Sequence, residues 1–563
     1  MSASISNSVE KRVVGRLSPF PHPWFTNWAP NAPPAQPLNH WRMQEMSNAI
    51  RSKPDWQRKY KDVEISRKWR NEIRQQYPDL DLMDKMFDYV LEELKWVEKM
   101  ENEYPGMKTS GFVMECDDRI VSSVTAIDET TRHKFVQQVQ SLHDSFGEEI
   151  DYHPGSKNQV IDLIHPSLFP VQYGTTVTKD DKGDYKIAEF SSDIPMAKDM
   201  TENSEFGVSK KFQWLPTPLT LNNKTGLFQF SSYINNLHPV QHKELYNTLE
   251  TIFNKTLPGL NFTLARFASP VYERVDEDVY TNPYQTHGKE SMWDHMNALE
   301  EAADADPSID FEDEWKLRVS KYMREIFSPY NKDPETVNFD LKEFGEVKVI
   351  TKIATIELTP EDPVYEGGSW HVEGTVNEDI VATIIYYFDS ENITTSKLSF
   401  RTGFGEPMYE QGDDLGVEFI FGLQEEQLLV RNIGEVTSET NKVVIWPNLF
   451  QHHVERFELA DKSKKGHRKI MCFFICDPYN DQVLATDKVP MQRKDWWDDA
   501  TLGMTDEEKA KISKASDGKL LQTLEQAFKI REELMAERAI DAELDPDDYS
   551  EMAYRTFFNL CEH

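Results

Sequence analysis

Between residues 346 and 476 the sequence is a series of short apolar runs, which Gly, Pro, Asn and Asp separate from one another. Short runs bounded by turn-forming residues are typical of β-strands rather than of helices. A set of this size folds as a sandwich or barrel of about eight strands. We predict strands at 347–350, 353–358, 380–388, 397–401, 417–421, 428–433, 443–446, 454–459 and 470–476.

The residues on both sides of this β-rich part show helical spacing instead. Thr505 and Glu508 form a capping-box pattern that predicts a helix near the C-terminus. Earlier helices are predicted at 55–102, 129–146, 241–254 (before Pro258) and 292–327. We therefore expect an N-terminal helical and irregular region (1–340) that covers the β structure, a β core (341–490) and a C-terminal helical extension (491–563).

The charge of the chain limits the partners that it can bind. Lys and Arg number 62 against 97 Asp and Glu, a formal net charge of -35, which argues against a nucleic acid partner. No apolar stretch is long enough to span a membrane, and residues 1–16 have no secretory pattern. Four cysteines in a chain of this length give no disulfide framework. We expect an intracellular, cytoplasmic protein with no membrane contact.

The most informative segment is 367–374, Gly-Gly-Ser-Trp-His-Val-Glu-Gly. In an extended chain, residues two apart face the same side, so His371 and Glu373 direct an imidazole and a carboxylate to one point. A second histidine completes a two-histidine, one-carboxylate set, the facial triad of non-haem Fe(II) oxygenases. We therefore predict a metal site that contains His371 and Glu373.

The third ligand is expected from a strand near the end of the same β structure. Residues 448–454 offer two neighbouring histidines, His452 and His453. Alternation places His452 with Val454 and Arg456, and His453 with Phe457, so periodicity does not choose between them.

A dicarboxylate cosubstrate also needs a cationic anchor. Arg468 stands at the start of the last apolar strand, where its guanidinium can bind a carboxylate through two hydrogen bonds. Arg456 competes for the same role if its side chain points inward. Three more histidines, His153, His165 and His238, are each followed by proline in a turn, and we interpret them as structural.

At these residues the sequence resembles a large fungal family known as domain of unknown function 4246, whose members are linked to the Fe(II)/2-oxoglutarate dioxygenase superfamily. The resemblance extends roughly from Leu82 to Pro478 and includes motifs at 151–156, 163–168, 232–239, 358–360, 367–378, 386–400, 451–459 and 466–469. It implies an α+β fold with a double-stranded β-helix (jelly-roll, cupin-like) core and extensive helices at both ends.

The resemblance also implies roles for single residues. It favours His452 over His453 as the third iron ligand, beside His371 and Glu373, and Arg468 over Arg456 as the anchor of 2-oxoglutarate. The carboxylate ligand is Glu here, where Asp is commoner in the superfamily. The implied activity is a 2-oxoglutarate-dependent, non-haem iron dioxygenase that oxidises, by hydroxylation, an organic substrate, either a small molecule or a protein.

Two other functions are compatible with these residues. A jelly roll with the same triad can bind Zn²⁺ or Mn²⁺ and act without 2-oxoglutarate, in which case the bound metal differs. A non-catalytic jelly-roll scaffold for a protein partner instead predicts that His371 is dispensable and that the region after Thr505 is essential.

Overall fold

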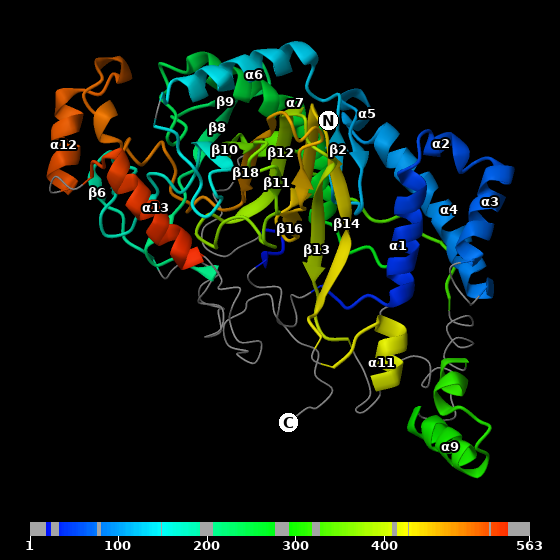
Figure 1. Ribbon diagram of the computed structural model, residues 1–563. Helices are drawn as coiled ribbons and strands as arrows, with labels where there is room; N and C mark the ends of the chain where they lie inside the picture. The colour runs from blue at the N-terminus through cyan, green and yellow to red at the C-terminus, as the bar shows by residue number, and fades with distance from the viewer. Residues whose placement is uncertain are drawn as a thin grey trace, which may run out of the picture.

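The computed structural model describes residues 18–23, 33–75, 80–147, 149–191, 207–275, 292–317, 327–407, 414–425, 427–516 and 520–538. At its centre is a large antiparallel sheet (Figure 1). In order, its strands are β1 (Val113–Met114), β2 (Val121–Ser123), β15 (Lys442–Pro447), β12 (Ile380–Glu391), β18 (Gly466–Cys476), β10 (Glu346–Leu358), β8 (Thr217–Asn222) and β9 (Leu227–Phe230), with β3 (Val160–Ile164) also paired to β10.

A smaller antiparallel sheet lies against the large one. It has the order β14 (Val430–Ser438), β13 (Ser396–Gly403), β16 (Gln451–Val454). Large apolar side chains from both sheets form one buried cluster between them: Ile350, Ile385, Tyr387, Leu398, Phe400, Ile433, Val444, Trp446 and Phe474. We call the side of the large sheet that carries these residues its inner face. The described strands form no closed barrel.

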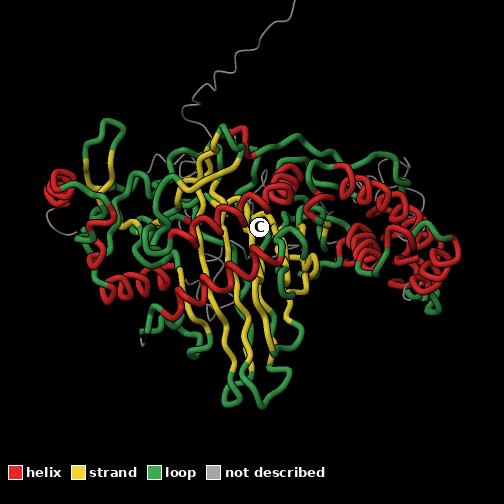
Figure 2. Tube along the Cα trace, turned by 90° about the horizontal axis from the view of Figure 1, so that it is seen from above, coloured by secondary structure: helices red, strands yellow, loops and turns green. Residues whose placement is uncertain are grey.

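Helices cover the other face of the large sheet. Figures 1 and 2 show α6 (Glu129–Asp144) and α7 (Lys243–Phe267) lying across the strands, and both contact β12. Outward side chains such as Ile384, Phe388 and Phe473 pack in the same buried cluster as Leu249 and Phe253 of α7. Successive side chains of each strand point to opposite faces of the sheet, and both faces are covered by apolar layers.

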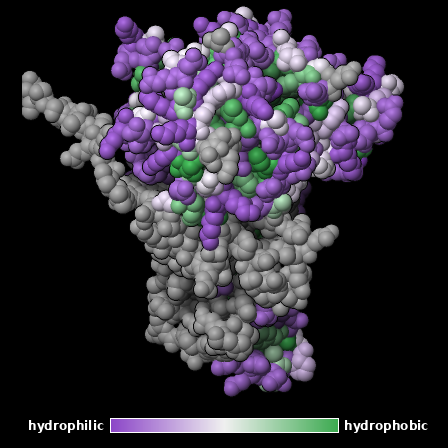
Figure 3. Space-filling model, turned by 90° about the vertical axis from the view of Figure 1, so that its left-hand side faces the viewer, coloured by the Kyte–Doolittle hydropathy of each residue, from purple (hydrophilic) through white to green (hydrophobic). Residues whose placement is uncertain are grey.

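The remaining helices lie at the two sides of the sheet (Figure 1). On one side are α1 (Leu38–Arg51), α2 (Trp56–Lys59), α3 (Val63–Arg74), α4 (Leu80–Glu103) and α5 (Met107–Ser110). On the other are α12 (Asp506–Ser516) and α13 (Leu524–Arg538), with the hairpin β5 (Val177–Lys179) and β6 (Tyr185–Ile187). The face on that side is mainly hydrophilic where it is described, with apolar side chains near its middle (Figure 3).

The remaining elements include the strand pairs β4 (Val171–Gln172) with β7 (Phe212–Gln213) and β11 (Val364–Tyr365) with β17 (Phe457–Glu458), and the helices α9 (Met292–Ala305) and α11 (Asp414–Phe421). None of the described helices is both long and apolar enough to cross a lipid bilayer.

The predicted class, helices combined with antiparallel sheet, is confirmed. Two local predictions were wrong. Residues 417–421 belong to α11 and not to a strand, because a short and mostly apolar run fits either structure, and Gly422 ends the helix with φ +68. The helix predicted at 241–254 continues as α7 through Pro258 to Phe267, since its apolar C-terminal part is buried.

Candidate metal centre

The structure brings His371, Glu373 and His452 together. One potential ligand atom from each of the three lies within 4.8 Å of the other two. The Glu373 carboxylate oxygen Oε1 is 3.4 Å from His452 Nε2 and 3.7 Å from His371 Nε2. We call these three residues the triad.

Backbone pairing explains this convergence. His371 and His452 form an antiparallel bridge, in which the His371 N–H donates to the His452 carbonyl (3.1 Å) and the His452 N–H donates to the His371 carbonyl (2.9 Å). Residues paired in this way carry their side chains on the same face of the sheet. Glu373 lies two residues beyond His371, and its carboxylate reaches the same face.

The environment of the triad suits a cation. Burial acts to raise the pKa of Glu373, but His371 and His452 outweigh it and hold that pKa well below its usual value. Burial, together with the charge of His371, lowers the pKa of His452 to about 4. The triad therefore offers an ionised carboxylate and a neutral imidazole, which are the protonation states that bind metals.

The His371 ring is oriented so that its Nε2, and not its Nδ1, faces the other two residues of the triad. Its Nδ1 lies 2.9 Å from the Ser369 carbonyl oxygen, which can only accept a hydrogen bond, so Nδ1 carries the proton. Nε2 lies 3.7 Å from Glu373 Oε1 and is the nitrogen that would bind a metal, which would displace the proton that it carries toward Glu373. Metal-binding histidines in proteins are commonly oriented by a carbonyl in this way.

The sequence left His453 open as an alternative to His452, and Arg456 as an alternative to Arg468. The His453 ring packs 4.1 Å from the Trp370 ring, away from Glu373. Arg456 is more than half exposed and pairs with Glu366 and Glu458 at the surface. Neither side chain faces the triad.

Arg468 lies deep between the two sheets, with 1% of its surface exposed. Its Nη1 donates to the Ser396 hydroxyl (2.6 Å), and its guanidinium lies 5.4 Å from the Tyr387 ring and 5.2 Å from the Phe457 ring. Within the described part of the chain, no carboxylate pairs with Arg468, and neither its Nε nor the Tyr387 hydroxyl has a hydrogen-bond partner. Buried donors without a partner are uncommon in native proteins, so this group of donors calls for an explanation.

The other three histidines lie elsewhere. His238 Nε2 pairs with Asp499 at 3.0 Å. His153 and His165 converge on Asp162, with His153 Nδ1 2.8 Å from a carboxylate oxygen. However, His165 Nδ1 accepts a hydrogen bond from the Ser167 N–H (3.2 Å), which places the proton on Nε2 and removes it as a ligand. Arg531 also lies 3.5 Å from Asp162, so this second cluster is a hydrogen-bonded ion network and not a metal site.

The sequence matches the family described as "Protein of unknown function (DUF4246)" over residues 84–500, and its N-terminal domain over residues 7–72. The chain belongs to the DUF4246 family. The triad and Arg468 all lie inside the matched segment. No curated protein matches the sequence.

Solved structures show weak similarity to this DUF4246 protein. The Fe(II)/α-ketoglutarate-dependent dioxygenase TqaL is 10% identical, with 63% of this chain and 95% of that chain covered and a TM-score of 0.23. IDO from Bacillus thuringiensis is 8% identical, with 23% and 46% covered and a TM-score of 0.16. A bsmA homolog from Methylobium petroleophilum PM1 is 7% identical, with 24% and 42% covered and a TM-score of 0.15. The chain thus spans less than half the length of the last two.

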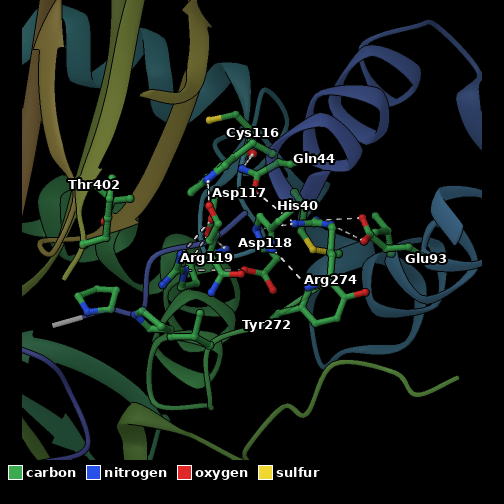
Figure 4. A pocket seen from close by; sticks show the side chains of 18 of the residues that line it. His40, Gln44, Glu93, Cys116, Asp117, Asp118, Arg119, Tyr272, Arg274 and Thr402 are labelled. Atoms are coloured by element: carbon green, nitrogen blue, oxygen red, sulfur yellow. Dashed lines mark hydrogen bonds and ion pairs between the residues drawn. The ribbon is translucent and has the colours of Figure 1, made fainter. Parts of the chain in front are cut away.

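A separate polar cavity of this DUF4246 protein lies between the N-terminal helices and the sheets (Figure 4). Arg274 binds Glu93 through Nε (2.7 Å) and Nη2 (3.1 Å), and Arg119 binds Asp117 at 2.8 and 3.0 Å. Each of these arginines already has its carboxylate, and no triad residue lines the cavity. We interpret it as an ion-pair network that joins the helices to the sheets.

Two residues beside the triad and Arg468 were not predicted: Asn448 and Ser396. Asn448 bonds to the backbone of Glu373, and Ser396 bonds to Arg468. Their residue types are common at surfaces and turns, so only their burial inside the fold distinguishes them.

Proposed function

We propose that this protein is an Fe(II)- and 2-oxoglutarate-dependent dioxygenase in which His371, Glu373 and His452 bind the iron. The two facing sheets are its jelly-roll core. One observation carries the proposal: two imidazoles and a carboxylate converge on one point, and a buried arginine that no carboxylate of the described residues pairs with lies on the inner face of the same fold. A scaffold protein needs neither feature.

The donor set of the triad fits iron. Two nitrogens and one oxygen on one side of a metal leave the remaining positions open for exchangeable ligands. Catalytic Zn²⁺ sites can have the same three donors and an open position. The donor set therefore fits both metals, and the surroundings of Arg468 favour the 2-oxoglutarate-dependent iron enzyme.

The surroundings of Arg468 fit the far carboxylate of 2-oxoglutarate. The guanidinium, the Ser396 hydroxyl and the Tyr387 hydroxyl are donors with unused bonding capacity at the same depth in the core. A carboxylate accepts hydrogen bonds from all three groups and neutralises the arginine. Leaving that cation unpaired inside the protein is costly, which favours a bound anion.

When bound, iron and 2-oxoglutarate supply the oxidation: dioxygen is reduced, 2-oxoglutarate becomes succinate and carbon dioxide, and a C–H bond of an organic substrate is hydroxylated. The protein's own residues do the placing. His371, Glu373 and His452 hold the metal, Arg468 fixes the orientation of the cosubstrate, and Phe400 and Trp446 pack against the His452 ring and keep it in place.

The test uses purified protein under anaerobic conditions, with Fe(II) and 2-oxoglutarate but no substrate. We expect a weak visible charge-transfer band, because bidentate binding of the keto acid to Fe(II) produces one. Glu373→Ala is expected to abolish the band, and Arg468→Ala to raise the 2-oxoglutarate concentration that is needed for it.

Two neighbouring residues provide matched controls. His453→Ala and Arg456→Met alter a histidine and an arginine of the same segment that do not face the triad, so both variants should retain the band. Wild-type protein that binds iron but shows no band with 2-oxoglutarate contradicts the proposal and favours a Zn²⁺ or Mn²⁺ enzyme or a scaffold.

A further inference from the structure

The C-terminal helix α13 packs on the apolar cluster between the two sheets. Leu534 is 1% exposed and belongs to this cluster, and Ile530, one turn earlier, packs against it. The cluster also contains Phe400 and Trp446, whose rings lie 6.5 and 4.9 Å from the His452 ring. One face of α13 is therefore built into the layer of side chains that contacts the candidate metal centre.

The next residue on this face of α13, Arg538, makes a buried ion pair with Glu378. It follows Leu534 by four residues, a spacing that places both side chains on one face of the helix. Arg538 Nη2 donates to Glu378 Oε1 (2.7 Å), and the Glu378 side chain has no exposed surface. The Trp214 ring lies 4.5 Å from the guanidinium, and the Trp214 backbone N–H donates to the same carboxylate (2.5 Å). Hydrogen bonds between ionised groups are short and strong, so this pair fixes the end of α13 against Glu378.

The other oxygen of Glu378 holds the residues that follow Glu373. Glu378 Oε2 accepts hydrogen bonds from the backbone N–H (2.6 Å) and from the hydroxyl (2.8 Å) of Thr375. Gly374, which separates Thr375 from Glu373, has φ +70. A Cβ atom on Gly374 would lie 3.1 Å from Glu378 Oε2 and 2.8 Å from Ile380 Cδ1, so only glycine fits there. The Glu378 carboxylate is thus packed against the residue next to the metal ligand.

Glu373 is therefore held from two directions. Asn448 bonds to its backbone N–H and carbonyl and fixes it relative to the large sheet. Thr375, two residues later, is fixed relative to α13 through Glu378 and Arg538. A metal site tolerates changes of only about 0.2 Å in the distances to its ligands. A small movement of the turn at 374–375 is enough to displace the Glu373 carboxylate from the two histidines.

A second arginine of α13 makes a buried ion pair that does not involve this turn. Arg531 Nη1 lies 2.8 Å from Asp151 and 3.5 Å from Asp162, whose side chain has no exposed surface. Among the described residues, neither of these carboxylates bonds to the triad or to residues 374–379. The two arginines of one helix thus separate the anchoring of α13 from the positioning of Glu373.

We propose that Arg538 is a positioning residue of the metal centre. Acting through Glu378, it sets the place of the Glu373 carboxylate, and metal binding therefore depends on the C-terminal helix. This role rests on the proposed function, because it takes His371, Glu373 and His452 as the metal ligands. The C-terminal extension is then a part of the site and not an appendage for a protein partner.

The test titrates the metal-free, full-length protein with Co(II), whose visible absorption reports both binding and the arrangement of the ligands. We expect Arg538→Met to weaken Co(II) binding about tenfold, the lower end of the range for groups that orient metal ligands, and to change the visible spectrum of the complex. Arg538→Lys keeps the charge beside Glu378 and should restore most of the affinity and the wild-type spectrum. Each titration is made well below the temperature at which that variant unfolds, so that unfolded protein is not counted as lost binding.

Arg531→Met is the matched control, because it removes the other buried ion pair of the same helix. It should lower the unfolding temperature and leave the Co(II) affinity and spectrum unchanged. Equal weakening in Arg531→Met and Arg538→Met, or no weakening in either, would overturn the role of Arg538. If Arg538→Met does not fold, Arg538→Gln, which can still donate to Glu378, is compared with Arg531→Gln in the same way. Wild-type protein that binds no Co(II) contradicts the proposed function itself, and the positioning role with it.

Discussion

The side-chain amide of Asn448 holds the backbone of Glu373 on both sides. Its Oδ1 accepts a hydrogen bond from the Glu373 N–H (2.9 Å), and its Nδ2 donates to the Glu373 carbonyl (2.8 Å) and to the Ile380 carbonyl (3.1 Å). Asn448 is almost fully buried and stands directly after β15. The carboxylate of the triad is thereby fixed relative to the large sheet.

We expect Asn448→Asp to lower the affinity of the protein for Fe(II) or Co(II) by about 10–100-fold, the range found when groups that orient metal ligands are removed. The new carboxylate oxygen would face two carbonyl oxygens and release the backbone of Glu373. Titration of the metal-free protein with Co(II) measures the effect. Asn441→Asp is the control: it also alters a buried asparagine bonded to carbonyls, but away from the triad, so it should reduce stability and not metal affinity.

The length of Glu373 should matter for the same reason. Glu373→Asp withdraws the carboxylate by one C–C bond, about 1.5 Å, while Asn448 keeps the backbone in place. We expect metal affinity to fall at least about tenfold, although Asp is a good ligand elsewhere. Adding Asn448→Ala to this variant should recover part of the affinity, since the backbone can then move. Full affinity in Glu373→Asp alone would contradict the role of Asn448.

Tyr387→Phe is expected to change stability and cosubstrate binding in opposite directions. Removing a buried hydroxyl that has no partner should stabilise the ligand-free protein by about 1 kcal/mol. The same change removes a donor from the Arg468 site, so 2-oxoglutarate should bind about fivefold to tenfold more weakly. Tyr386 provides the control, because its hydroxyl donates to Asn441 (2.7 Å) on the other face of the sheet. Tyr386→Phe should reduce stability and leave 2-oxoglutarate binding unchanged.

His165 should make the protein sensitive to acid. Burial lowers its pKa from 6.5 to about 3, so between these values the unfolded chain binds a proton that the folded protein does not. Stability therefore falls as the pH decreases from 6.5, by about 2 kcal/mol at pH 5 from this residue. His165→Asn keeps an acceptor for Ser167 and should flatten the pH dependence of the denaturation midpoint between pH 7.5 and pH 5. An unchanged slope would show that His165 titrates normally in the folded protein.

Arg538 of α13 should stabilise the loop that follows Glu373. Its Nη2 donates to Glu378 (2.7 Å), a carboxylate with no exposed surface that also accepts from the backbone N–H groups of Trp214 and Thr375. We expect Arg538→Met to cost about 1–3 kcal/mol, because it leaves that buried charge less compensated. Lys529→Met, which removes an exposed ion pair with Glu525 in the same helix, should have no measurable effect on thermal unfolding.

The apolar runs of the β-rich segment predicted β10, β12 and β18, because each run is bounded by turn-forming residues and is too short for a buried helix. The strands β1, β2, β3, β8 and β9 were not predicted. They are two to six residues long and form only because a distant strand pairs with them, which no local pattern records.

The residues of the candidate site were also predictable only in part. The spacing of His371 and Glu373 was sufficient to predict that they face one point, since alternation is a local rule. The choice between His452 and His453 depends on which face of β16 is turned inward, and that is set by pairing with β13 and with His371. Asn448 could not be found, because its importance comes from neighbours that are remote in the sequence.

Strand β10 has consequences for how the chain is made. Ile353 pairs with Ile164 on one side and with Met471 on the other, and residues 346–349 pair with β8. During synthesis β18 emerges from the ribosome long after β10, so one hydrogen-bonding edge of β10 stays unpaired in the meantime. Such long-range pairing also slows folding. The nascent chain should therefore depend on chaperones until Cys476 has been added, and a fragment that begins at residue 341 should aggregate for want of β3 and β8.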